Sequence, residues 1–119
     1  EVVLWDDEYS YLIVDIGPLS RGHLLLIPKE HTEYMHELND LTLSKMLINI
    51  KNIVLKLGYD KYNLLQNNGH IQSVNHVHFH IVPANNTNDS LSVNWVVQDV
   101  DSEYVKRTQE KVRAILAKK

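Results

Sequence analysis

The chain has 119 residues, a formal net charge of −3 and no cysteine, and 44% of its residues are hydrophobic. This size and composition are typical of one globular domain with a single core, so we expect one domain over residues 1–119. The acidic balance excludes a nucleic-acid-binding surface built on bulk positive charge, and no apolar run is long enough for a membrane helix. The lack of cysteine excludes disulfides and thiolate metal sites.

We therefore expect neither nucleic acid nor a membrane as a partner. A chain without cysteine and without a signal peptide fits the cytoplasm, or the nucleus as well. Because the sequence begins with Glu1 rather than Met, we also expect that a native amino-terminal segment is missing.

Three short strands are predicted first in the chain. Residues 2–5 are apolar and form the first, and residues 9–15 alternate polar and apolar positions before Gly17-Pro18 ends the second. Residues 23–27 form the third strand, which Pro28 ends, and residues 32–38 hold a short helical turn.

A long amphipathic helix is predicted over residues 41–57, because apolar residues recur there at steps of three and four. They are Leu43, Met46, Leu47, Ile50, Val54 and Leu57. Asn39, Asp40 or Thr42 can cap its start, and Gly58 suits the position after its end. A strand over residues 62–66, a turn over 67–70, a histidine-rich strand ending at Pro83 and a second helix over 102–118 follow, whereas residues 95–100 are ambiguous.

The predicted order is therefore β-β-β-α-β-β-α. Because short loops join the strands, they pair largely in antiparallel fashion, which indicates an α+β meander rather than an alternating α/β fold. We expect a five-stranded, mainly antiparallel sheet with a central amphipathic helix and a carboxyl-terminal helix. The amphipathic helix covers one face of the sheet and leaves the other face for chemistry.

The most informative pattern is the alternation of His76, His78 and His80 with apolar residues. On a strand, residues two apart point the same way and lie about 6.6–7 Å from each other. Three imidazoles then share one face while the apolar residues pack behind them. Since imidazole titrates near pH 6.5, this face can supply a nucleophile, an acid, a base or a metal ligand.

Two chemistries are compatible with that face. Three imidazoles can bind a catalytic zinc, but on a straight strand these span about 13 Å, so only two reach one ion and a third ligand must come from elsewhere, such as His23 or His31. The other chemistry is phosphoryl or nucleotidyl transfer, in which the central imidazole attacks phosphorus and its neighbours stabilise the negative oxygens. The polar pair Gln72 and Ser73 then supplies further donors.

The sequence resembles the histidine triad (HIT) nucleotide-binding family, whose hallmark is His-φ-His-φ-His-φ-φ with φ apolar. Residues 76–82 match it at every position, and residues 72–75 resemble the family's lead-in. Residues 67–69 resemble its Asn-x-Gly turn, and residues 14–16 and 22–31 resemble two upstream blocks. The similarity is greatest to the nucleoside phosphoramidase branch.

The resemblance implies a role for each matching residue. His78 is then the nucleophile that forms a nucleotidyl-histidine intermediate. The backbone carbonyl of His76 accepts a hydrogen bond from the proton-bearing nitrogen of His78. His80, Gln72 and Ser73 contact the phosphate or the leaving group. Asp15 then binds the ribose hydroxyls, and Ile13 and Ile16 form part of the base pocket. Asn67 lies near the α-phosphate, and His23 supports the nucleophile from the adjacent strand.

The resemblance also bears on cofactors and assembly. Many relatives begin with Cys-x-x-Cys, which can bind a structural zinc with histidines equivalent to His31 and His76. Because this chain has no cysteine, we expect no metal and no cofactor unless a missing amino-terminal segment supplies that pair. Family relatives are homodimers, so we expect a homodimer that joins the sheets or the central helices of two subunits.

The resemblance implies an enzyme that cleaves purine nucleoside phosphoramidates or acyl adenylates at the α-phosphorus. One alternative is the fragile-histidine branch, whose members hydrolyse dinucleoside polyphosphates. A second alternative is a nucleotide-binding regulatory module in which turnover is incidental, because binding and catalysis use the same residues.

Overall fold

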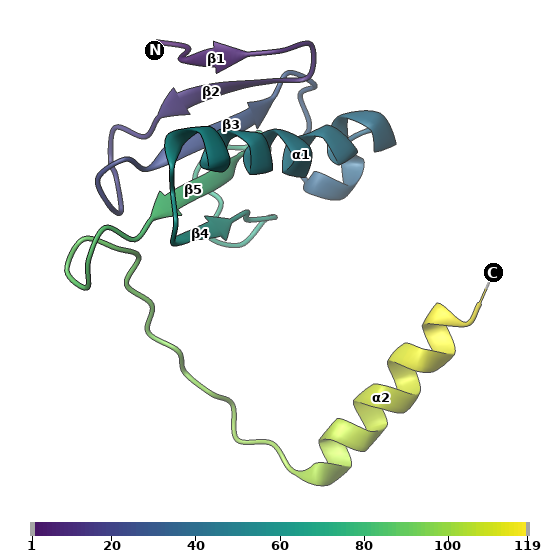
Figure 1. The fold of residues 1–119 in the computed structure, drawn as a ribbon. Helices are drawn as coiled ribbons and strands as arrows, with labels where there is room; N and C mark the ends of the chain where they lie inside the picture. The colour runs from purple at the N-terminus through teal and green to yellow at the C-terminus, as the bar shows by residue number, and fades with distance from the viewer. Residues whose placement is uncertain (1, 119) are drawn as a thin grey trace.

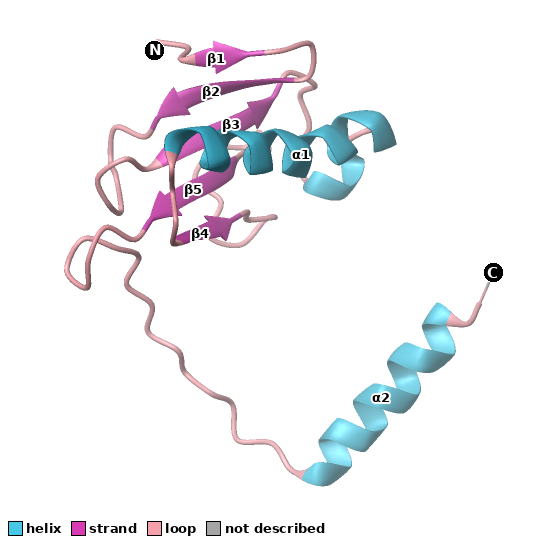
Figure 2. Cartoon of the chain, in the orientation of Figure 1, coloured by secondary structure: helices cyan, strands magenta, loops and turns pink. Residues whose placement is uncertain are grey.

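The computed structural model describes residues 2–118, and over this range it has one five-stranded sheet and two α-helices. Figure 1 labels these elements and Figure 2 colours them by type. The elements run in the order β1 (Trp5–Asp6), β2 (Ser10–Val14), β3 (Leu24–Pro28), a 3-10 helix η1 (Met35–Glu37), α1 (Asp40–Leu57), β4 (Tyr62–Leu65), β5 (Phe79–Pro83) and α2 (Ser102–Leu116). The predicted α+β class and the order of elements are confirmed.

The sheet has the strand order β1-β2-β3-β5-β4, and each neighbouring pair is antiparallel. The prediction of a meander was wrong, because β5 lies between β3 and β4 and so β4 forms an edge. After β3 the chain passes through α1 and then forms β4 at the edge of the sheet. β5 follows and inserts between β3 and β4. This arrangement puts β5 in the interior of the sheet, where its side chains are held from both sides.

α1 covers one face of the sheet (Figure 1). Its core-facing side packs on alternate residues of β2, β3 and β5, and the buried cluster includes Leu24, Leu26, Met46, Ile50, Phe79 and Ile81. Asn39 caps the helix by accepting a hydrogen bond from the Thr42 amide at 2.9 Å. At the other end Gly58 adopts the left-handed conformation with φ of 71°, which suits glycine.

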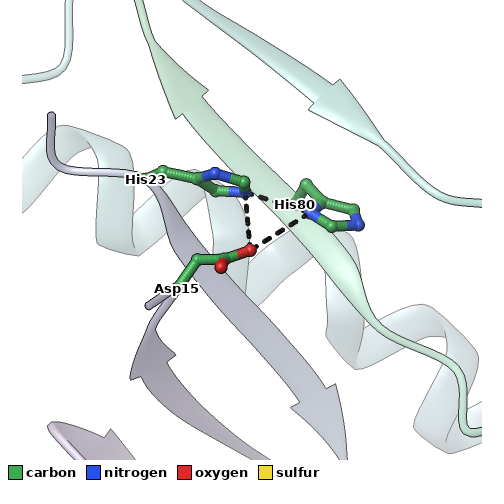
Figure 3. A group of neighbouring side chains, drawn as sticks. All are labelled: Asp15, His23 and His80. Carbon is green, nitrogen blue, oxygen red and sulfur yellow. Dashed lines mark hydrogen bonds and ion pairs between the residues drawn. The ribbon is translucent and has the colours of Figure 1, made fainter. Parts of the chain in front are cut away.

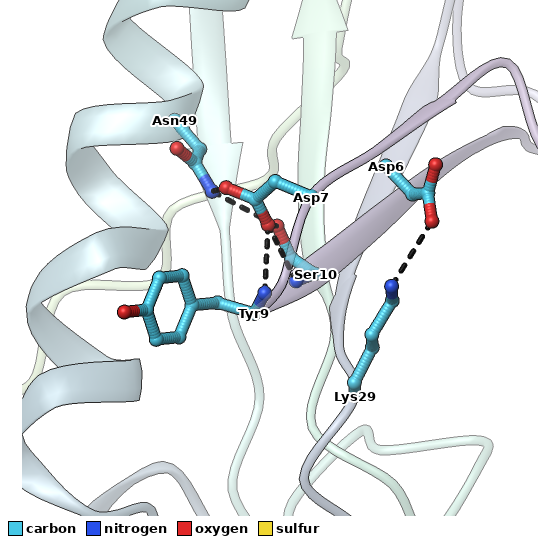
Figure 4. A network of polar contacts seen from close by, with 6 residues as sticks. All are labelled: Asp6, Asp7, Tyr9, Ser10, Lys29 and Asn49. Atoms are coloured by element: carbon cyan, nitrogen blue, oxygen red, sulfur yellow. Dashed lines mark hydrogen bonds and ion pairs between the residues drawn. The ribbon is translucent and has the colours of Figure 1, made fainter.

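The core-facing side of α1 differs from the predicted one. Leu47 and Leu57 are exposed, whereas Thr42, Asn49 and Ile53 are buried. Asn49 is buried because its amide donates to Asp7 and to the Ser10 hydroxyl, each at 3.0 Å (Figure 4). A polar side chain therefore lies on the inward face, whereas Leu47 and Leu57, which the hydrophobic pattern placed there, lie outside it.

The first strand and the histidine strand also differ from the prediction. β1 covers Trp5–Asp6 rather than residues 2–5, and β5 begins at Phe79, so His76 and His78 precede the strand. The backbone amide of Val77 donates to the carbonyl of Thr32 at 2.9 Å instead of to a neighbouring strand. Val77, Phe79 and Ile81 are nevertheless buried, as the alternation predicts.

α2 lies away from the sheet, at the end of an irregular segment (Figure 1). It ends at Leu116 rather than residue 118, and every residue from 92 to 118 is exposed. The ambiguous residues 95–100 form neither helix nor strand. Within residues 2–118 there is no helix whose length and apolarity would let it cross a bilayer.

Candidate active site

The face of the sheet opposite α1 carries the histidines, because alternate residues of a strand point to opposite sides. Leu24 and Leu26 point into the core beside α1, so His23 lies on the other face. Leu25 of β3 pairs with His80 of β5, which brings the histidines of the two strands together. The Asp15 amide donates to the carbonyl of His23 at 3.1 Å, so the pairing of β2 with β3 extends to both residues.

A hollow of about 280 Å³ opens on this face. It is lined by Tyr11, Ile13, Asp15, Leu25, Ile27, Ser73, Val74, His76, His78 and His80. Its volume is near the lower end of the roughly 300–1,000 Å³ typical of small-molecule sites. A second hollow of about 400 Å³, between β1 and α1, has mostly apolar walls and contains no histidine or carboxylate. Of these two hollows, the histidine hollow is the one with groups that can act as nucleophile, acid or base.

His78 has a fixed tautomer in this hollow. Its Nδ1 lies 2.7 Å from the backbone carbonyl oxygen of His76, and a carbonyl can only accept, so Nδ1 carries the proton. In the neutral ring Nε2 then has a free lone pair. The His78 ring is held edge-on to the His80 ring at a centroid distance of 4.9 Å. This arrangement is what an attacking imidazole requires.

His80 is linked to the backbone through His23. The Leu19 amide donates to Nδ1 of His23 at 3.0 Å, so the proton of the neutral His23 ring is on Nε2. That nitrogen lies 3.0 Å from Nδ1 of His80, which must therefore accept. The remaining ring proton of His80 is consequently on Nε2. The Leu19 amide, which is two hydrogen bonds away from His80, thus determines which nitrogen of His80 donates.

Asp15 completes a partly buried polar group with these two rings (Figure 3). Its Oδ2 lies 3.5 Å from Nε2 of His23 and 3.9 Å from Nδ1 of His80, while its Oδ1 accepts from the Gly17 amide at 2.8 Å. The His23 side chain is 1% exposed. The carboxylate therefore faces both the hollow and the histidine pair.

Burial favours the neutral form of the His23 and His80 imidazoles. It lowers the pKa of His80 to about 4, helped by the nearby rings of His78 and His23 and opposed by Asp15. Burial also lowers the pKa of His23, against the attraction of Asp15. Near neutral pH both rings are uncharged, which is the state that the hydrogen-bond chain from Leu19 to His80 requires.

Residues 1–87 match the protein-family model described as HIT domain, and this range includes every residue of the histidine hollow. The chain belongs to the HIT domain family. The match ends before α2, so the expectation of one domain over the whole chain stays a prediction.

Individual HIT proteins are similar over nearly the whole chain. The adenosine 5′-monophosphoramidase hnt1 of Schizosaccharomyces pombe is 42% identical over 93% of this chain and 85% of its own length. The adenosine 5′-monophosphoramidase HNT1 of Saccharomyces cerevisiae is 36% identical over 95% of this chain and 73% of its own length. The crystal structure of a histidine triad nucleotide-binding protein from Candida albicans is 34% identical and aligns with a TM-score of 0.86, covering 97% of this chain and 87% of that one.

Most of the predicted site residues of this HIT domain meet in the hollow. The histidine triad, Asp15, Ile13 and Ser73 line it, and His23 contacts His80 from behind. Three predicted residues do not line it. They are Ile16, which is 99% exposed, Asn67 and Gln72. Their predicted roles in binding the base, the α-phosphate and the leaving group stay predictions.

Gln72 has a different set of partners in the structure. Its Nε2 donates to the carbonyl of Glu33 and its Oε1 accepts from the Gly69 amide, each at 2.8 Å. These bonds tie the segment before the histidines to the loop that contains η1. In the structure, both polar ends of this side chain are therefore engaged with the backbone of neighbouring loops.

Sequence reasoning missed four lining residues, namely Tyr11, Leu25, Ile27 and Val74. Leu25 and Ile27 follow His23 at steps of two along β3, and Tyr11 precedes Ile13 in the same way along β2. The strand period that grouped the histidines therefore contained the signal for three of them. Val74 lies in the irregular segment, where no period applies.

Two sets of side chains could ligate a metal. Within residues 2–118, donor atoms of Asp15, His23 and His80 lie within 4.8 Å of one another, but the hydrogen bond between the two rings already accounts for their approach. The rings of His31 and His76 lie 4.4 Å apart, and Nε2 of His76 donates to the carbonyl of Pro28 at 2.8 Å. A structural zinc needs four ligands and His31 and His76 supply half of them, so among residues 2–118 this pair does not complete such a site.

Proposed function

We propose that this HIT protein hydrolyses purine nucleoside phosphoramidates, or acyl adenylates, at the α-phosphorus through a covalent intermediate on His78. The observation that carries the proposal is the free Nε2 of His78 in a hollow lined by two further histidines. The names of its relatives from two yeasts, both adenosine 5′-monophosphoramidases, support the choice of substrate.

In the first step Nε2 of His78 attacks the α-phosphorus, and the bond from phosphorus to the leaving nitrogen breaks. The amine leaves with a proton taken from water, which reaches it through the open side of the hollow. As the imidazole becomes positively charged, the carbonyl of His76 stabilises the Nδ1 proton. The product of this step is a nucleotidyl-histidine.

His80 and Ser73 contact the transferred phosphate in this proposal. His80 donates a hydrogen bond from Nε2, because its Nδ1 already accepts from His23. Being neutral, it avoids repulsion with the positive ring that forms at His78. Ser73 lines the same hollow and adds a hydroxyl donor.

In the second step water attacks the nucleotidyl-histidine. The new bond joins the water oxygen to phosphorus, the bond to Nε2 breaks, and the released proton goes to solvent. The products are the nucleoside monophosphate and the original neutral His78. No metal takes part in either step.

The nucleoside half occupies the apolar part of the hollow. Ile13, with Tyr11 and Ile27, supplies a surface against which a purine can lie, and the Asp15 carboxylate accepts hydrogen bonds from the ribose hydroxyls. We propose further that the enzyme acts as a homodimer with nucleotides as its ligands and no nucleic acid, in the cytoplasm or the nucleus.

The test is the release of nucleoside monophosphate from adenosine 5′-monophosphoramidate. Wild type should turn over, and His78→Ala should lose activity by at least about a thousandfold, because no other group replaces the nucleophile. His36→Ala is the matched control, since His36 is exposed and stacks on Tyr34 outside the hollow. Equal rates for wild type and His78→Ala would refute the proposal. A strong preference for dinucleoside polyphosphates in the same assay would move the enzyme to the alternative branch.

A further inference from the structure

The hydrogen bonds that set the tautomer of His80 begin in a loop. Their first donor is the backbone amide of Leu19, which lies 3.0 Å from Nδ1 of His23, and Nε2 of His23 lies 3.0 Å from Nδ1 of His80 (Figure 3 shows the two rings). Leu19 belongs to residues 17–22, the loop between β2 and β3, which contains neither helix nor strand. The tautomer of His80 therefore depends on what holds this loop in place.

Ser20 anchors the 17–22 loop to the strand that carries His80. Its hydroxyl donates to the backbone carbonyl of Pro83 at 2.7 Å, and Pro83 is the last residue of β5. Ser20 is only 5% exposed, so water does not compete for this bond. The contacts form a closed ring, which runs from His80 through His23 to Leu19 and returns to β5 through the residue that follows Leu19.

Other hydrogen bonds hold the same loop, but they are exposed. The Arg21 amide donates to Oδ1 of Asp89 at 2.9 Å, and the Tyr59 hydroxyl donates to the carbonyl of Gly22 at 2.7 Å. Water can replace a lost partner at an exposed bond, whereas a buried group that loses its partner stays unsatisfied. The buried bond of Ser20 is therefore the anchor whose loss the loop can compensate least.

Ser20 also adjoins both groups of the first hydrogen bond. Leu19 precedes it in the chain, and the backbone amide of His23 donates to the Ser20 carbonyl at 3.2 Å. A displaced Ser20 therefore moves the Leu19 amide relative to the His23 ring, and a hydrogen bond weakens steeply when its donor is misaligned. Without that amide, His23 can carry its proton on Nδ1 and accept from Nδ1 of His80, which leaves Nε2 of His80 without a proton.

We propose that Ser20 is a positioning residue of this site. Its bond to Pro83 holds the Leu19 amide on His23 and so keeps the proton of His80 on Nε2. Ser20 is not among the residues that line the hollow, so its effect passes through His23. The consequence for turnover rests on the proposed function, in which Nε2 of His80 donates to the transferred phosphate, whereas the effect on the tautomer needs no substrate.

Nitrogen NMR of the substrate-free protein tests the positioning directly. Nε2 of His80 should be protonated in wild type, and Ser20→Ala should give a mixture of the two His80 tautomers. Ser44→Ala is the matched control, because the Ser44 hydroxyl also donates to a backbone carbonyl, that of Leu41 at 2.8 Å, but at an exposed position of α1. A wild-type tautomer in folded Ser20→Ala would overturn the proposal.

Ser20→Cys is a second variant that separates the hydrogen bond from packing. It keeps a side chain of similar size but replaces the hydroxyl with a thiol, which is a weak donor. It should therefore give a mixture of His80 tautomers as Ser20→Ala does, and it serves in place of Ser20→Ala if the alanine variant does not fold. A wild-type tautomer in Ser20→Cys would count equally against the proposal.

Kinetics give a further measurement through a double-mutant cycle. With adenosine 5′-monophosphoramidate, Ser20→Ala should lower kcat by about three- to tenfold and leave KM within about twofold, since one hydrogen bond is lost away from the substrate. In a His23→Leu background the same substitution should lower kcat no further, because both changes break one ring of contacts. A second fall of the same size would show that Ser20 acts independently of His23 and would overturn the proposal.

The two kinds of measurement distinguish this proposal from the proposed function. If wild type releases no nucleoside monophosphate, the proposed function fails, and the His80 tautomer in Ser20→Ala still decides whether Ser20 positions the ring. If wild type turns over but Ser20→Ala keeps both the wild-type tautomer and the wild-type kcat, the proposed function stands and the role of Ser20 is refuted.

Discussion

The backbone carbonyl of His76 accepts a hydrogen bond from Nδ1 of His78 at 2.7 Å, and the ring of His78 is thereby oriented with Nε2 as its free nitrogen. The partner is a main-chain atom, so substitution of the His76 side chain does not remove it. The His76 side chain has a separate role, because its Nε2 donates to the carbonyl of Pro28 at 2.8 Å and holds the segment against the end of β3.

The chain of hydrogen bonds from Leu19 through His23 to His80 predicts how His23 substitutions behave. His23→Leu removes the donor to Nδ1 of His80, so the proton of His80 is no longer confined to Nε2. We expect kcat to fall about tenfold or more with little change in KM, a loss of about 1.4 kcal/mol that matches one hydrogen bond. His23→Gln retains an N–H donor and should recover most of the activity.

Nitrogen NMR of the His80 ring separates this positioning role from a merely structural one. In wild type and His23→Gln the Nε2 signal should be that of a protonated nitrogen, and in His23→Leu the two tautomers should mix. An unchanged His80 tautomer in His23→Leu would contradict the hydrogen-bond chain.

The lowered pKa of His80 predicts a pH-dependent stability. The folded protein takes up the proton only near pH 4, whereas the unfolded chain takes it up near pH 6.5, so the unfolded state binds more protons between these values. Stability is therefore complete above about pH 6.5 and falls as the pH drops, by about 2 kcal/mol at about pH 5.

Urea unfolding of wild type and His80→Gln at about pH 7.5 and about pH 5 measures this effect. His80→Gln should lose less stability between the two pH values than wild type. Parallel losses in the two proteins would show that His80 is not the group responsible. His70→Gln, at an exposed histidine, serves as the control.

The alternation of apolar and histidine positions was sufficient to predict the shared face and the buried residues behind it. The short loops between strands were sufficient to predict the antiparallel class. The alternation could not reveal that β5 begins only at Phe79, because the amide of Val77 is taken by the distant carbonyl of Thr32. Contacts between residues far apart in sequence leave no periodic signal.

The lack of a periodic signal for distant contacts also explains why the burial of Asn49 and the position of α2 could not be predicted. The inward turn of Asn49 depends on Asp7 and Ser10, which lie about forty residues earlier in the chain. The separation of α2 from the body has a similar cause, because its apolar side has the same pattern as a helix that packs on its own sheet. Local pattern predicts that a face will be covered, but not by which surface.

Asp15 is predicted to distinguish ribose from deoxyribose. Asp15→Asn should raise KM for an adenosine phosphoramidate by about tenfold, because a charged acceptor contributes about 1.5–3 kcal/mol to a hydrogen bond. Wild type should discriminate against the 2′-deoxy substrate, and Asp15→Asn should discriminate less. Equal discrimination by the two proteins would remove Asp15 from ribose binding and leave it as a partner of His23.

The central claim is that Nε2 of His78 attacks phosphorus, and rapid quenching with substrate labelled at the α-phosphate tests it most directly. Ser73→Ala should slow the second step enough for label to accumulate on the protein, and peptide mapping should place that label on His78. Label on His76, His80 or any other residue, or turnover in which no protein-bound label ever forms, would contradict the account.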